Sequence, residues 1–283
     1  MHLSDKYPFL IKYFENAINN PEKSIAHSIL FYGNDLNAQY ELATYISRFL
    51  NCKKDKNNDC DCLDCNWIKS GEHPAVLTIS RVENKPEDDE SKTVISLKQA
   101  NLIKQSLLNS SDFNRVFIFC DRDDNNNVAG LNKLNFQEET ANALLKTIEE
   151  PPERTTFFFL TRDKNDLIST IISRSQCFFV PSFEHEDTDW TPIKDIFENY
   201  YEFERQEVFN VANSLNELSK DSIKTLEQIQ SYMLSLMKNN FENKPFLVRV
   251  LHDIQSVETA KKQIIARVTP INAFENLCID IIK

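Results

Sequence analysis

The pattern of apolar positions is clearest between Glu139 and Val180, where it predicts a helix, a strand, a short helix and a second strand. One helix face follows the i, i+3, i+4, i+7 spacing, with Ala141, Leu144, Leu145 and Ile148. Pro151 comes soon afterwards and cannot continue the helix. The run Thr156 to Leu160 is apolar and aromatic without alternation, as is typical of a strand buried on both faces.

Five short apolar runs, near residues 29, 76, 116, 157 and 178, predict strands, and most are separated by helical patterns. Parallel strands need crossover connections of about a dozen or more residues, which are usually helical. The sequence therefore predicts an α/β fold, with a parallel five-stranded sheet wrapped by helices. Before the third of these runs, Ser96 and Gln99 have the spacing of a capping box at the start of a helix.

The pattern changes after Val180. No further strand is predicted, and residues 194–283 have the spacing of successive amphipathic helices. The last of these carries its apolar face at Ile271, Phe274, Leu277, Cys278 and Ile281. We therefore expect a boundary near residue 182 between an α/β domain and an all-α C-terminal region.

The bulk properties restrict the function classes. The chain has 283 residues, is 41% hydrophobic and has a net charge of −11. No apolar run approaches the roughly 18 residues of a membrane span, and residues 1–20 lack a signal-peptide pattern, so we expect a cytoplasmic protein with no membrane partner. The negative charge argues against tight DNA binding by the chain alone, because that requires a basic field to neutralise phosphates.

Four of the seven cysteines lie within fourteen residues and have the spacing C-x7-C-x-C-x2-C, namely Cys52, Cys60, Cys62 and Cys65. Thiols in a cytosolic chain remain reduced, so this cluster predicts a metal site, with zinc the default ion. A closed shell of four sulfurs leaves no position for water, which makes the site structural. A cysteine-rich loop or a redox pair is the alternative. The single cysteines Cys120, Cys177 and Cys278 lie in apolar surroundings and are interpreted as core thiols.

The turn after the first predicted strand stands where a phosphate-binding loop, G-x-x-x-x-G-K-[ST], would lie in a nucleotide-binding fold. Gly33 matches the first glycine, but Ala38 replaces the second. Gln39 replaces the lysine that contacts the β and γ phosphates, and Tyr40 replaces the hydroxyl residue that binds magnesium. This degenerate loop predicts that the chain binds no ATP.

Other polar residues carry weaker signals. Asp121 follows a predicted core strand, where a magnesium-binding carboxylate can lie, but acidic residues also cap turns there. His27 and His73 have no evident catalytic partners and are interpreted as structural. Arg174 is expected to be exposed just before the last strand, where it either serves only solubility or contacts a neighbouring subunit's phosphate.

Several segments together resemble the delta-prime subunits of the bacterial DNA polymerase III clamp loader, a divergent branch of the AAA+ family. The segments are HSILFYG (27–33), GEHP (71–74), ANALLKTIEEPP (141–152) and FLTRDKNDLISTIISRS (159–175), together with the four-cysteine module. The resemblance covers about residues 25–180. It implies an AAA+-like sheet over residues 1–181, with the zinc module inserted at about residues 50–68.

The resemblance also implies roles for individual residues. Ser173 and Arg174 match a Ser-Arg-Cys motif, with Ser175 in place of the cysteine, whose arginine contacts the ATP of the adjacent motor subunit. Thr161 matches a sensor position after a strand. A small helical lid and a helical collar are expected to follow. Residues 182–206 are too few for a full lid and are predicted to be a linker or a reduced lid, and residues 207–283 the collar, an oligomerisation domain.

The function implied is that of a stator, a clamp-loader subunit with no activity of its own. It supports ATP-dependent loading of the sliding clamp and supplies Arg174 to a neighbour. The implied partners are the gamma/tau motor subunits and the delta subunit in a pentameric ring, and the sliding clamp and primer-template DNA through the assembled complex. Two alternatives remain open: an active gamma/tau-type ATPase, and a zinc-dependent nucleic-acid-binding module unrelated to replication.

Overall fold

A computed structural model describes residues 3–20, 25–57, 60–86, 95–123, 125–134, 136, 138–218, 220–240 and 242–282 of the chain. The chain divides into two units, Met1–Val180 and Pro181–Lys283, each described here by itself. None of the helices within these ranges combines the length and the apolar character that crossing a membrane requires.

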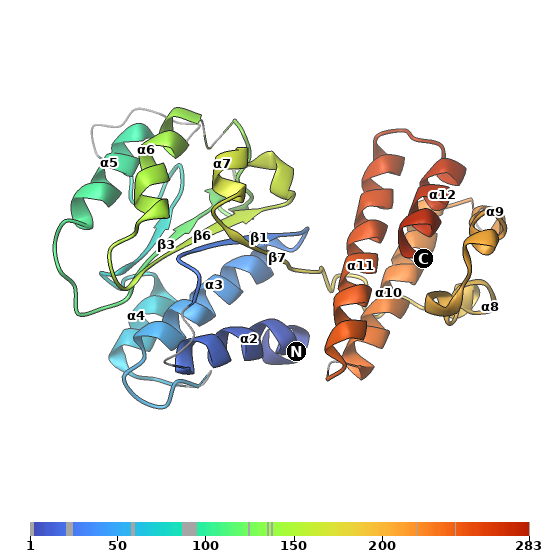
Figure 1. The fold of residues 1–283 in the computed structure, drawn as a ribbon, viewed down its shortest axis with the longest axis horizontal. Helices are drawn as coiled ribbons and strands as arrows, with labels where there is room; N and C mark the ends of the chain where they lie inside the picture. Colours follow the sequence, from blue (N-terminus) through green and yellow to red (C-terminus); the bar gives the residue numbers. More distant parts are fainter. Residues whose placement is uncertain are drawn as a thin grey trace. The chain divides into compact units, whose positions relative to one another are not determined.

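Five parallel strands form the sheet of the first unit, within the described residues (Figure 1). Their order is β2-β3-β6-β1-β7, with β1 (Ser28–Tyr32), β2 (Val76–Ile79), β3 (Arg115–Phe119), β6 (Thr155–Thr161) and β7 (Gln176–Phe179). Every neighbouring pair is parallel; β1, for example, pairs Ser28 with Phe157 of β6 and Ile29 with Gln176 of β7. The predicted parallel five-stranded sheet is confirmed.

Helices cover both faces of this sheet. Figure 1 shows α5, α6 and α7 on one face and α2, α3 and α4 on the other. The helices of this unit are α1 (Leu3–Lys6), α2 (Pro8–Asn19), α3 (Leu36–Asn51), α4 (Leu63–Ser70), α5 (Leu97–Ser106), α6 (Glu138–Glu149), the 3₁₀ turn η1 (Lys164–Asp166) and α7 (Ser169–Ile172). The predicted capping box is present, since Ser96 and Gln99 bond reciprocally at the start of α5.

Aromatic side chains from alternate positions of β6 fill both sides of the sheet. All seven residues of β6 are buried. Phe159 stacks on Phe119 of β3 with ring centroids 5.0 Å apart, and Phe158 stacks on Phe31 of β1 at 5.7 Å. Successive side chains of a strand point to opposite faces, so a continuous aromatic run can pack against both helical layers. This is why β6 carries no polar alternation.

One element was not predicted from the sequence. The polar stretch after β3 contains a short antiparallel hairpin of β4 (Asp121–Arg122) and β5 (Val128–Ala129). The Asp123 carboxylate accepts hydrogen bonds from the backbone N–H groups of Asn125 and Asn127, at 2.9 and 2.8 Å, which closes the turn. Strands of two residues are too short to show a period, so the sequence indicates only a loop.

The second unit is all helical within the described residues, as expected. It consists of the 3₁₀ turns η2 (Thr191–Ile193), η3 (Tyr200–Glu202) and η4 (Arg205–Glu207), and of the helices α8 (Lys194–Phe197), α9 (Val208–Leu218), α10 (Ser222–Asn239), α11 (Lys244–Ile265) and α12 (Pro270–Ile281).

The segment 182–206, which the sequence leaves as a linker or a reduced lid, folds onto the helices of this second unit. Gln230 of α10 donates a hydrogen bond to the Ser182 carbonyl at 3.1 Å, and Ser231 donates to the Glu186 carbonyl at 2.9 Å. Tyr200 is fully buried. Gln228 also donates to the Asp189 carbonyl at 3.0 Å, and the Asn199 backbone N–H donates to the Tyr232 hydroxyl at 3.1 Å, so α10 holds the segment at several points between Ser182 and Asn199.

Candidate functional site

The four clustered cysteines come together in space. Their sulfur atoms all lie within 4.8 Å of one another, and all four side chains are buried. Cys52 directly follows α3, Cys62 precedes α4 and Cys65 lies within α4, so the two helix ends hold three of the sulfurs. Residues 58 and 59, between Cys52 and Cys60, lie outside the described residues. Zinc bound by four sulfurs at about 2.3 Å places them about 3.8 Å apart, and a limit of 4.8 Å puts this cluster within small side-chain adjustments of that geometry.

The chemistry of the thiols also suits a cation. The backbone N–H of Cys62 lowers the pKa of the Cys60 thiol to about 7, which favours the thiolate. The pKa of Cys65 is raised chiefly because burial disfavours its charged form, and further by hydrogen bonds and charge repulsion from Cys62 and Cys52. A divalent metal ion removes this conflict by binding all four as thiolates. These residues therefore fit a structural zinc ion.

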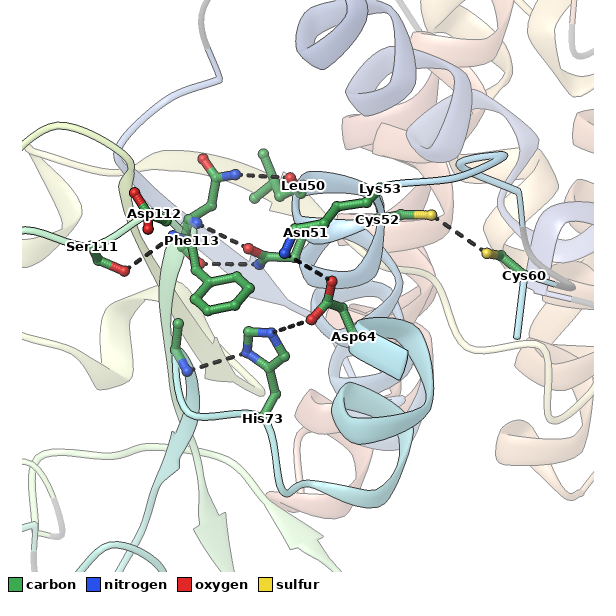
Figure 2. Close-up of polar contacts among 12 residues, drawn as sticks. Leu50, Asn51, Cys52, Lys53, Cys60, Asp64, His73, Ser111, Asp112 and Phe113 are labelled. Atoms are coloured by element: carbon green, nitrogen blue, oxygen red, sulfur yellow. Dashed lines mark hydrogen bonds and ion pairs between the residues drawn. The ribbon is translucent and has the colours of Figure 1, made fainter. Parts of the chain in front are cut away.

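Polar contacts join this cluster to the sheet (Figure 2). Asn51, the last residue of α3, donates to the Asn114 carbonyl at 3.0 Å and accepts from the Asn114 backbone N–H at 2.9 Å, directly before β3. Lys53 lies over the Phe113 ring and forms an ion pair with Asp64 at 3.4 Å. The cysteine module is thus attached to the main fold through its flanking helices.

His73 belongs to this contact region rather than to the metal ligands. Its ring is 1% exposed, packs edge-on against Phe113, and accepts a hydrogen bond at Nδ1 from the Ala75 backbone N–H at 3.2 Å (Figure 2). Burial lowers the pKa of His73, which favours the neutral ring. His27 is exposed directly before β1. The burial and contacts of His73 fit its structural interpretation.

Gln39 occupies the place where the lysine of a phosphate loop would lie. It is fully buried in the first turns of α3. Its side-chain amide donates to the carbonyls of Gly33 and Thr161, at 2.9 and 3.1 Å, and its carbonyl accepts from the Thr161 backbone N–H at 3.2 Å. The glutamine side chain therefore connects the turn after β1 to the end of β6 by hydrogen bonds to backbone groups of Gly33 and Thr161.

The start of α3 is also occupied by the chain itself. The Asp35 carboxylate accepts a hydrogen bond from the Ala38 backbone N–H at 2.9 Å and caps the helix. The backbone N–H groups at a helix N-terminus are the usual donors to a bound phosphate, and a carboxylate there repels that anion. Sequence reasoning missed Asp35, although an aspartate directly before a helical pattern is a recognised capping signal.

Tyr40 and Gly33 complete the degenerate loop. The Tyr40 hydroxyl forms a hydrogen bond with Thr78 of β2 at 2.8 Å, and Arg122 lies over its ring. Gly33 has a φ of +137°, and a Cβ atom there would lie 2.2 Å from the Val180 carbonyl oxygen. The close approach of Val180 and the backbone conformation therefore require glycine at this position. They explain Gly33 without a role in phosphate binding.

The magnesium and sensor positions have internal partners as well. Asp121 is 1% exposed and forms two hydrogen bonds with Arg81, at 2.8 and 2.7 Å. The Thr161 hydroxyl is fully buried and lies 2.9 Å from the Leu131 carbonyl and 3.0 Å from the Asp163 carbonyl. A carboxylate paired with a guanidinium is a poor ligand for a cation, because its charge is already neutralised.

Arg174 lies on the surface between α7 and β7. It forms an ion pair with Glu149 at the end of α6, and its Nη1 donates to the Thr170 carbonyl at 3.0 Å and to the Ser173 hydroxyl at 3.2 Å. Ser175 turns inward, where its hydroxyl bonds to Ser28 of β1 at 2.7 Å. Within the described residues, none of these contacts links Arg174 to the degenerate loop.

One interpretation of the single cysteines is wrong. Cys120 and Cys278 are buried, as expected, but Cys177 is exposed. It lies in β7, which is the edge strand of the sheet. An apolar run in the sequence does not show which strand has a neighbour on one side only.

The fold and these sites define an α/β protein with a parallel sheet, a buried Gln39 bonded to the turn after β1, and four clustered cysteines that could hold a metal ion. The chain belongs to the DNA polymerase III, delta subunit family, whose model matches residues 7–184. The resemblance to delta-prime subunits is confirmed by the curated relatives.

A DNA polymerase III subunit delta' of Buchnera aphidicola subsp. Schizaphis graminum is 32% identical over 188 residues, covering 65% of this chain and 52% of the relative. The Escherichia coli (strain K12) subunit delta' is 26% identical over 193 residues, with the same two coverages of 65% and 52%. A subunit tau of Bacillus subtilis (strain 168) is 23% identical over 231 residues, covering 81% of this chain and 37% of the relative. The chain thus spans about half the length of the delta' relatives it matches.

Proposed function

We propose that this chain is a non-hydrolysing subunit of the DNA polymerase III clamp loader that supplies Arg174 to the ATP of a neighbouring motor subunit. The observation that carries the proposal is the occupied phosphate position. Gln39 takes the place of the lysine and is fully buried. Asp35 places a carboxylate on the helix N-terminus that a phosphate needs.

The remaining features fit this role. Arg174 is exposed and is carried by the short connection between α7 and β7, so it can contact a ligand outside the chain. A planar guanidinium that contacts a neighbour's ATP stabilises the charge that develops during phosphoryl transfer. Zinc at Cys52, Cys60, Cys62 and Cys65 stabilises the inserted module. Within the second unit, residues 207–283 serve as the collar, and residues 182–206 serve as a reduced lid attached to it.

The partners in this proposal are the gamma/tau motor subunits and the delta subunit in a pentameric ring, working in the cytoplasm. The sliding clamp and primer-template DNA are contacted through the assembled complex, because the net charge of −11 does not suit DNA binding by this chain alone. The occupied phosphate position argues against an active gamma/tau-type ATPase. The same net charge argues against an independent nucleic-acid-binding module.

Reconstitution tests the proposal. Mixing this chain with delta and gamma/tau subunits is expected to give a complex that contains one copy of this chain, measured by native mass spectrometry. The mixture without this chain is the control and is expected to lack the complete ring. Failure of the chain to enter any complex with these subunits contradicts the proposed function.

A further inference from the structure

The ion pair between Glu149 and Arg174 joins two elements that are distant in sequence. Glu149 is the last residue of α6, and Arg174 follows α7. Both Nε and Nη2 of the guanidinium face the same carboxylate oxygen, Oε1 of Glu149. The two side chains are 33% and 43% exposed, for Arg174 and Glu149 respectively, so the pair lies at the surface and is open to an incoming ligand.

The third nitrogen of the guanidinium, Nη1, has partners within this chain. Nη1 donates to the Thr170 carbonyl and the Ser173 hydroxyl, at 3.0 and 3.2 Å. The edge formed by Nε and Nη2 is a planar pair of donors that recognises carboxylate and phosphate in the same geometry. A phosphate that binds Arg174 through this edge therefore has to displace Glu149.

Helix stability does not explain an acid at this position. A carboxylate at the C-terminal end of a helix faces the negative end of the helix dipole and is unfavourable there. Arg174 offsets that repulsion. Neutralising Glu149 removes the repulsion together with the ion pair, so we expect the fold to tolerate the change.

We propose that Glu149 is an internal counterion that holds Arg174 and competes with the neighbouring subunit's phosphate for it. This rests on the proposed function, in which Arg174 contacts that phosphate. Glu149 is then a positioning residue: it keeps the guanidinium ordered at the surface of the free chain and gives it up when a more highly charged anion arrives. Because Arg174 leaves Glu149 only when a phosphate is present, its contact with the neighbouring subunit depends on bound nucleotide.

The expected effect is modest, because the ion pair is exposed. In the reconstituted complex, Glu149→Gln is expected to lower the apparent KM for ATP by about two- to fivefold at low salt, with kcat unchanged. This corresponds to about 0.4–1 kcal/mol at 1.36 kcal/mol per tenfold, the range of surface ion pairs. The shift should shrink at high salt, where surface charges are screened.

A matched control lies one residue away. Glu150 is exposed and makes no ion pair with the residues that the structure describes, and Glu150→Gln removes the same charge. This variant is expected to leave KM unchanged. Glu149→Gln is also expected to have no effect when combined with Arg174→Ala. A second readout uses the isolated chain: phenylglyoxal should modify Arg174 a few-fold faster in the Glu149→Gln variant, with the exposed Arg162 as internal reference.

The outcomes separate this inference from the function on which it rests. If Arg174→Ala does not change the ATPase, the proposed role of Arg174 fails. If Arg174→Ala slows the ATPase but Glu149→Gln leaves KM unchanged, raises it, or lowers kcat, the role of Glu149 as a competitor is overturned and that of Arg174 stands. An unchanged phenylglyoxal rate contradicts the competition in the free chain.

Discussion

Arg174→Ala is expected to slow ATP turnover at the neighbouring subunit's site by roughly 10³-fold, the lower end of the range for arginine fingers. Removing the guanidinium takes away a positive charge that is most valuable when charge develops on the transferred phosphate. The measurement is single-turnover hydrolysis of ATP in the reconstituted complex with primer-template DNA. Native mass spectrometry should show that the ring still assembles, because the side chain of Arg174 is exposed and its polar contacts among the described residues are to Glu149, Thr170 and Ser173 of its own chain.

The control for this experiment is Arg162→Ala. Arg162 is an exposed arginine directly after β6 and carries the same charge. The Arg162→Ala variant is expected to leave the rate of ATP hydrolysis unchanged. An Arg174→Ala complex that hydrolyses ATP at the normal rate would reduce Arg174 to a surface residue that serves only solubility.

Cys65→Ser is expected to abolish zinc binding and to lower the melting temperature of the chain by about 10 °C or more. Cys65 is the most buried of the four clustered cysteines, at 1% exposure. A structural zinc site supplies several kcal/mol of folding free energy, and each kcal/mol shifts the melting temperature of a domain of this size by about 2–4 °C. Metal analysis should give about one zinc per wild-type chain and none for the variant.

Cys177→Ser provides the matched control, because Cys177 is exposed in β7 and distant in sequence from the cluster. It should retain zinc and the wild-type melting temperature. A chelator should destabilise the wild-type chain and leave Cys65→Ser unaffected. A wild-type protein purified without metal, with the same melting temperature before and after zinc is added, would show that the cluster is not a structural metal site.

The fold could largely be predicted because its signals are local. The apolar run that forms β6 and the Ser96 capping box each depend on residues within a few positions of one another. The five strands follow from such runs, and their parallel arrangement follows from the length of the connections. The clustered cysteines are close in sequence too, so their convergence could be expected.

The state of the candidate sites depends on contacts between distant residues and could not be predicted. Gln39 is recognisable as a missing lysine, but its bonds to Thr161 span 122 positions. The ion pair of Glu149 with Arg174 spans 25. Nothing in the local pattern indicates which partner an exposed side chain will find. The sequence therefore shows that the lysine of a phosphate loop is missing. The hydrogen bonds that Gln39 makes in its place are seen only in the structure.

The same reason accounts for the segment 182–206. The resemblance implies a lid there, but the segment has too few residues for a full one, so the expectation is a linker or a reduced lid. In the structure its backbone carbonyls accept hydrogen bonds from Gln230 and Ser231 of α10. The bonded residues are 48 and 45 positions apart in the sequence, so no local pattern indicates these bonds.

Calorimetric titration of ATP and magnesium into the isolated chain tests the central claim most directly. We expect no heat of binding up to about 1 mM ATP, because Gln39 and the Asp35 carboxylate occupy the position that a triphosphate requires. A purified gamma/tau subunit titrated in parallel should bind and serves as the positive control. Saturable binding of ATP to this chain with a micromolar Kd would contradict the assignment of a subunit that does not use nucleotide.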